Sequence, residues 1–147
     1  MIFLVCASGA AAFHSTEDFQ LLHHASGAHG KIANACTGLA PGRFSSVSRD
    51  LKLRIWNGFE SDTFATPNDH SIKCIAACAS GRFVATGSYS GLVAIMDLKT
   101  RAWVKSLRVT TAGVSSLSFD NLTGAFLASS YDGRIYEVKV EEVEAVA

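Results

Sequence analysis

A short pattern returns along this chain at a nearly constant interval. The stretch SRDLKLRIWN at 48–57 is matched by SYSGLVAIMD at 88–97, by SYDGRIYEVK at 130–139 and more weakly by CASGAAAFHS at 6–15. The third residues of these stretches, Ser8, Asp50, Ser90 and Asp132, are 42, 40 and 42 residues apart. A repeat of this length predicts a fold assembled from similar units that stack on one another, because each unit is too small to bury a core alone.

Each copy contains several short strands separated by turns. An apolar segment comes first, as in GKIANAC; a turn such as APGR and a second strand such as FSSVS follow, and the recurring stretch then begins a third strand. A fourth segment, as in SDTFAT, closes the better copies. No helical periodicity separates these segments, so the sequence predicts an all-β fold. We expect strands near 2–6, 10–14, 32–37, 44–48, 52–56, 62–65, 73–78, 83–88, 92–96, 103–107, 114–119, 126–130 and 134–138.

The repeat resembles the WD-repeat β-propeller family over nearly the whole chain. In the best copy, GAH at 27–29 precedes SRDLKLRIWN, which gives a Gly-His opening, a Ser-x-Asp turn and Trp56, with Asn57 where the family usually has Asp. The later copies depart further: the second keeps His70 and Asp97, whereas Met96 and Val138 stand at the Trp position.

The resemblance implies blades of four antiparallel strands that form a partial or half propeller over residues 1–140. We divide this region into a partial blade at 1–26 and blades at 27–67, 68–108 and 109–140, followed by an acidic tail at 141–147. Propellers of this kind have four to eight blades, and the two ends of this chain do not complete one blade. We therefore expect a segment of a larger propeller, or a half completed by self-association or by additional blades.

The resemblance also assigns a role to the residues around the recurring turn. In such blades a His, a Ser or Thr, an Asp and a Trp form a hydrogen-bonded chain, which by position is His29, Ser48, Asp50 and Trp56. The alternative is a Ser/His/Asp nucleophilic site. We disfavour it because the same spacing recurs without all three members, and we expect no enzyme and no catalytic residues.

The middle position of the recurring turn points to a binding surface. It holds Ala7, Arg49, Tyr89 and Tyr131 in successive copies, and Arg and Tyr are frequent anchors of protein interfaces. We expect a non-enzymatic scaffold that binds a protein or peptide partner through the propeller rim. Two alternatives stay open: these side chains only cap turns and face water, or the chain is an accessory segment of a larger multidomain enzyme or regulatory protein.

Charge and composition argue against other classes of function. The chain has 13 basic and 13 acidic residues, so no net field favours nucleic acid, and no apolar stretch is long enough to cross a membrane. We expect no metal and no cofactor, because the cysteines lack paired spacing and the neighbouring His23 and His24 would face opposite sides of a strand. The apolar start has no basic residue before Lys31, which favours a cytoplasmic protein over a secreted one.

Overall fold

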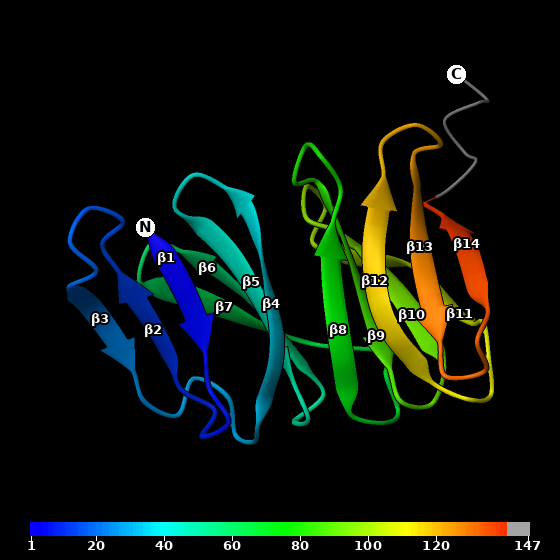
Figure 1. Ribbon diagram of the computed structural model, residues 1–147, viewed down its shortest axis with the longest axis horizontal. Helices are drawn as coiled ribbons and strands as arrows, with labels where there is room; N and C mark the ends of the chain where they lie inside the picture. The colour runs from blue at the N-terminus through cyan, green and yellow to red at the C-terminus, as the bar shows by residue number, and fades with distance from the viewer. Residues whose placement is uncertain (141–147) are drawn as a thin grey trace.

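Residues 1–140 form a row of four antiparallel β-sheets (Figure 1). The computed structural model describes residues 1–140, so the acidic tail expected at 141–147 lies outside the described residues. The strands are β1 (Ile2–Val5), β2 (Ala11–His14), β3 (Leu21–Ala25), β4 (Ala33–Ala40), β5 (Arg43–Ser48), β6 (Lys52–Asn57), β7 (Glu60–Ala65), β8 (Ile72–Ala77), β9 (Phe83–Ser88), β10 (Leu92–Asp97), β11 (Ala102–Arg108), β12 (Val114–Asp120), β13 (Ala125–Ser130) and β14 (Ile135–Lys139). The expected all-β fold of antiparallel blades is confirmed.

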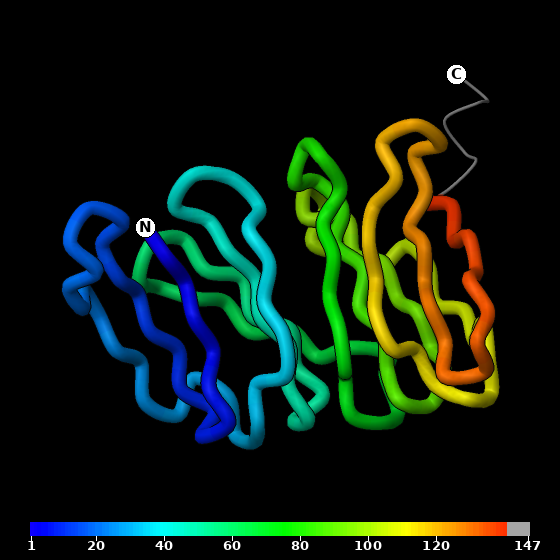
Figure 2. Tube along the Cα trace, viewed as in Figure 1, coloured from blue at the N-terminus to red at the C-terminus, as the bar shows by residue number. Residues whose placement is uncertain are grey.

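Each sheet is built from consecutive strands. The orders are β1-β2-β3, β4-β5-β6-β7, β8-β9-β10-β11 and β12-β13-β14. Figure 2 shows the chain running up and down within one sheet before it passes to the next. When the sheets are aligned by their recurring turns, β1 to β3 correspond to the second, third and fourth strands of a full sheet. Strands β12 to β14 correspond to the first three. Strands β4, β8 and β12 lie side by side across the row (Figure 1).

Strand β3 was absent from the expected set. Its sequence, LLHHA, places two apolar and two polar residues in succession, so it lacks the alternation that marks a half-buried strand. The pairing of Phe13 with His23 and of Ala11 with Ala25 nevertheless adds it to β2. Backbone pairing across a hairpin therefore created a strand that side-chain pattern did not reveal.

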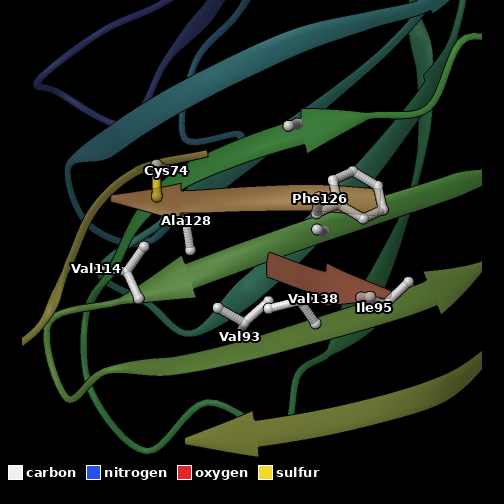
Figure 3. Close-up of a cluster of buried hydrophobic side chains, with 9 residues drawn as sticks. Cys74, Val93, Ile95, Val114, Phe126, Ala128 and Val138 are labelled. Carbon is white, nitrogen blue, oxygen red and sulfur yellow. The ribbon is translucent and has the colours of Figure 1, made fainter. Parts of the chain in front are cut away.

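Among the described residues, three apolar clusters hold neighbouring sheets together. The cluster between the last two sheets contains Cys74, Val93, Ile95, Val114, Phe126, Ala128 and Val138, which converge from both sheets (Figure 3). Another, around Val47, Leu53 and Ile72, joins the middle sheets. A third, around Phe3, Phe13 and Trp56, joins the first two. Because the middle sheets are covered on both faces, β10 is apolar along most of its length instead of alternating.

No helix within residues 1–140 is long and apolar enough to cross a lipid bilayer.

Candidate functional site

A hydrogen-bonded chain of four side chains runs through the sheet formed by β4 to β7. Trp56, on β6, donates its indole N–H to the Ser46 hydroxyl on β5 across 3.0 Å. The same hydroxyl oxygen lies 2.8 Å from Nε2 of His29, which stands in the loop before β4. Nδ1 of His29 lies 3.1 Å from a carboxylate oxygen of Asp50, in the turn after β5. Three of the four residues expected in this network are thus brought together, and Ser46 joins them.

The protonation state of His29 follows from its surroundings. The residue is only 2% exposed, and this burial lowers the pKa of His29 below 6.5 even though the Asp50 carboxylate acts in the opposite direction. A neutral imidazole with its proton on Nδ1 donates to Asp50 and accepts the Ser46 proton at Nε2. The Ser46 oxygen then accepts from Trp56, so every polar hydrogen in the chain has an acceptor.

The Asp50 carboxylate is occupied by groups of its own sheet. Besides His29, it accepts the N–H of Gly30 at 3.0 Å and that of Lys52 at 2.9 Å. Burial acts to raise the pKa of Asp50, but these N–H groups and His29 outweigh it and hold that pKa below 3.8. An ionised carboxylate with this many donors fixes the turn to the loop before β4.

Ser48 does not occupy the place that the sequence predicted. Its hydroxyl donates to the Lys31 carbonyl oxygen at 3.2 Å and accepts the Asp50 N–H at 3.1 Å, which stabilises the turn. The reason is cross-strand register: Trp56 pairs with Phe44, so Ser46 is its diagonal neighbour on the same face. Ser48 lies two residues farther along β5, beyond the reach of the indole.

The geometry of these residues does not expose a nucleophile. Ser46 has no exposed surface and stands between His29 and Trp56, where no substrate has access. The Ser48 hydroxyl is engaged by backbone groups on both sides. Within residues 1–140, no group of three or more His, Cys, Asp or Glu side chains is placed to hold a metal ion.

The other four-stranded sheet, formed by β8 to β11, has smaller networks in place of this hydrogen-bonded chain of side chains. Asn68, 5% exposed, donates its side-chain amide to the Thr86 hydroxyl at 2.9 Å. Asn68 thus takes the inward position that the sequence suggested for His70, whose side chain is exposed and accepts the Ser71 N–H. Neither Ser46 nor Asn68 was singled out from the sequence. One signal in the sequence could have identified Ser46. A small polar residue recurs four positions before the third residue of the turn, as Ser46 before Asp50 and as Thr86 before Ser90.

The last sheet has a third arrangement around its turn. The Ser130 hydroxyl donates to Thr110 at 3.0 Å, and Thr110 donates to Asp132 at 3.1 Å. The Tyr136 hydroxyl also reaches Asp132, at 2.7 Å. The turn aspartate keeps its structural role here, with a hydroxyl in place of an imidazole.

Arg49, Tyr89 and Tyr131 stand at one edge of the row of sheets. The backbone N–H of each donates to a carbonyl oxygen just before the first strand of its own sheet, at Ile32, Ser71 and Gly113 respectively, and each of the three distances is 3.1 Å. We define this edge, the lower one in Figure 1, as the rim. Arg49 and Tyr131 are exposed, and Tyr89 is half-buried.

The two tyrosines of the rim touch across neighbouring sheets. Their ring centroids are 6.3 Å apart and their planes differ by 4°, which is an offset stack. His70 meets Tyr89 edge-on at 6.1 Å, and the Lys73 ammonium lies 5.9 Å from the centre of the same ring. The rim is therefore a continuous aromatic and basic surface at this junction.

A hollow of about 410 Å³ lies beside this surface, between the second and third sheets. Its lining consists of Gly30, Lys31, Arg49, Asp50, Leu51, His70 and Ser71. Arg49 is the one predicted partner-binding residue in it. Lys31, Leu51 and His70 were not predicted to act together, because their neighbourhood depends on how two sheets meet.

Comparison with known proteins adds two findings. Residues 61–97 match the family described as WD domain, G-beta repeat. This segment runs from β7 through β8 and β9 to β10, so one sequence repeat joins the outer strand of one sheet to three strands of the next. The chain is also similar to the U3 snoRNP-associated protein-like EMB2271 of Arabidopsis thaliana, with 28% identity over a 130-residue alignment that covers 71% of this chain and 27% of that protein. The chain thus spans about a quarter of the length of this relative.

Proposed function

We propose that this chain, which contains a WD repeat in an all-β array of antiparallel blades, is a non-enzymatic scaffold that holds a protein or peptide partner on the rim of Arg49, Tyr89 and Tyr131. WD repeats generally mediate interactions between proteins. The observation that carries the proposal is the equivalent backbone anchoring of these three residues at one edge. Because these backbone hydrogen bonds fix each of the three residues to its own sheet, the backbone of the rim needs little further ordering on binding.

The chemistry of the rim suits recognition better than catalysis. Tyr and Arg bring large contact areas together with directional hydrogen bonds, and they are enriched among residues that dominate binding energy. The polar groups that resemble a catalytic set, Ser46, His29 and Asp50, satisfy one another inside the sheet. A scaffold needs only the observed geometry, whereas catalysis needs an accessible nucleophile.

The similar plant protein suggests the kind of partner. Its name associates it with the U3 snoRNP, and we propose that this chain likewise docks protein subunits of a ribonucleoprotein particle. The partner contact is assigned to protein because the chain carries equal numbers of basic and acidic residues. The second candidate function is that of an accessory segment in a larger multidomain enzyme or regulatory protein. This candidate is kept because the chain covers only 27% of the length of the relative.

Affinity purification with the tagged full-length protein tests the scaffold proposal. The wild type is compared with the triple variant Arg49→Ala, Tyr89→Ala, Tyr131→Ala, and co-purified proteins are quantified by mass spectrometry. Each truncation should weaken binding by roughly 1–2 kcal/mol or more. The loss of the tyrosine stack costs about 0.5–1.5 kcal/mol of stability, so thermal unfolding of each variant sets the temperature for the comparison.

A control variant separates the rim from a general surface effect. Lys99→Ala with Leu122→Ala removes two exposed side chains from turns at the opposite edge, where Leu122 is 96% exposed. These substitutions should leave the recovered partners unchanged. Equal recovery of partner proteins by the wild type and the rim variant would show that the rim is not the binding surface.

The cytoplasmic location expected from the sequence stays a prediction. Fluorescence imaging of the tagged full-length protein tests it, and a signal confined to the nucleus would contradict it.

A further inference from the structure

Leu51 departs from the residue type used at its repeat position. The fourth residues of the recurring turns, Gly9, Leu51, Gly91 and Gly133, donate their N–H groups to the residues three before them at 2.9, 3.3, 3.1 and 3.0 Å. All four have positive φ, at 86°, 66°, 89° and 83° respectively. Glycine adopts this conformation freely, whereas a branched apolar side chain does so at a cost in free energy. A residue kept at such a cost points to a contribution outside the turn itself.

The side chain of Leu51 also changes how two sheets meet. At Gly9 and Gly91, the loop that follows lies so close that an added Cβ atom would collide with the carbonyl oxygens of His29 and Thr110. At Leu51 that close approach is sterically excluded. The hollow of about 410 Å³ lies there instead, bounded by His70 and Ser71 of the following loop.

The hollow combines two basic side chains, Lys31 and Arg49, with the apolar side chain of Leu51. Lys31 and Arg49 are exposed, and neither forms an ion pair within residues 1–140. Asp50 is the one acid in its lining, and its oxygens already accept from His29 and from two backbone N–H groups. The hollow therefore has free donors for an anion and a free apolar surface on Leu51.

We propose that this hollow binds an acidic peptide segment that carries one apolar side chain. Its carboxylates pair with Lys31 and Arg49, and the apolar side chain packs on Leu51. The proposal rests on the scaffold function and narrows the partner to one chemical class. A nucleic acid offers the negative charge but no aliphatic side chain for Leu51, so the peptide fits the lining better.

Fluorescence anisotropy with the purified full chain measures this preference. The probe is a fluorescein-labelled peptide of glutamates around a central leucine. Two analogues carry glutamine in place of glutamate, or alanine in place of leucine. The parent peptide should bind most tightly, and its affinity should fall as salt is raised because exposed charge pairs are screened. A glutamine analogue that binds as tightly as the parent peptide overturns the proposal.

Variants of the hollow locate the site on the chain. Lys31→Gln with Arg49→Gln should weaken the parent peptide about fivefold or more, whereas Lys99→Gln, at the opposite edge, leaves its affinity unchanged. Leu51→Gly should abolish the preference for leucine over alanine while thermal stability is kept or raised, since glycine relieves the positive φ. If Leu51→Gly keeps the full preference for leucine, the proposal that the apolar side chain of the peptide packs on Leu51 is wrong.

Two further outcomes separate this inference from the scaffold function. A single-stranded oligonucleotide of equal charge that displaces the peptide and binds more tightly would assign the hollow to nucleic acid and overturn the peptide proposal. Failure of the acidic peptide to bind, combined with loss of co-purified partners in the Arg49, Tyr89 and Tyr131 variant, would refute the acidic preference and leave the scaffold in place.

Discussion

The hydroxyl oxygen of Ser46 lies 2.8 Å from Nε2 of His29, and both side chains are almost completely shielded from solvent. The contact ties β5 to the loop that enters β4, which are 17 residues apart in sequence. Since Trp56 donates to the same oxygen, one hydroxyl joins three segments of the sheet. Removing it leaves two buried groups without partners.

Ser46→Ala should lower the free energy of unfolding by roughly 1–3 kcal/mol, because His29 Nε2 and the Trp56 indole N–H lose their partner in a buried site. The indole N–H resonance of Trp56 in NMR spectra should shift and exchange faster with solvent. Trp103, whose indole N–H donates to the Ala65 carbonyl oxygen at 2.9 Å, serves as the internal reference.

Ser48→Ala is the matched control for that experiment. It removes the hydroxyl contacts with Lys31 and Asp50 but leaves the environment of Trp56 intact. An unshifted Trp56 resonance in Ser46→Ala, or an equal shift in Ser48→Ala, would contradict the observed register.

Stability should fall as the pH is lowered below 6.5. Burial holds the pKa of His29 below that ordinary value, so in this range the unfolded chain binds a proton that the folded protein resists. The contribution of His29 is fully present above pH 6.5 and is lost as the pH falls toward the lower pKa of the folded state. Urea unfolding at pH values on either side of 6.5 measures the slope.

His29→Asn should be less stable at neutral pH but show a flatter dependence on pH, because asparagine does not titrate. A wild-type slope in His29→Asn would refute the assignment to His29.

At more acidic pH a second loss of stability follows from Asp50. Its N–H donors hold the pKa of Asp50 below 3.8, so its contribution to stability is present above pH 3.8 and is lost as the pH falls further.

Two glycines at the same repeat position should respond differently to alanine. Gly91→Ala should cost more than about 2 kcal/mol, because positive φ is combined with a collision against the Thr110 carbonyl oxygen. Gly133→Ala has open space around the added Cβ atom, so only the strain of positive φ remains, about 1 kcal/mol. Chemical denaturation of both variants gives the comparison, and equal losses would mean that the close approach at Gly91 is unimportant.

Asn57→Asp should stabilise the protein slightly. Nε of Arg43 donates to the Asn57 side-chain oxygen at 2.8 Å, as Arg82 does to Asp97 in the next sheet at 3.1 Å. A carboxylate at Asn57 would add charge to this exposed contact and contribute about 0.2–1 kcal/mol at low salt. The gain in thermal midpoint should disappear at high salt, and a gain that persists there would point to a different cause.

The sequence determined the architecture of the protein. The spacing of Ser8, Asp50, Ser90 and Asp132, together with short apolar segments bounded by turn residues, predicted repeated sheets and most of the strands. These signals are local, since each strand pattern and each turn is written within a few residues. His29, Asp50 and Trp56 could be grouped in advance because the best copy of the repeat resembles the WD-repeat family, in which residues at these places form a hydrogen-bonded chain.

Only the tertiary structure decided which side chains meet. Cross-strand register placed Ser46 instead of Ser48 beneath Trp56, a choice between two serines on one strand face that the sequence presents alike. Pairing with β2 made β3 a strand despite its pattern. The hollow at Leu51 lies where the second and third sheets meet at the rim, and the distance between sheets is set by packing across residues far apart in the chain.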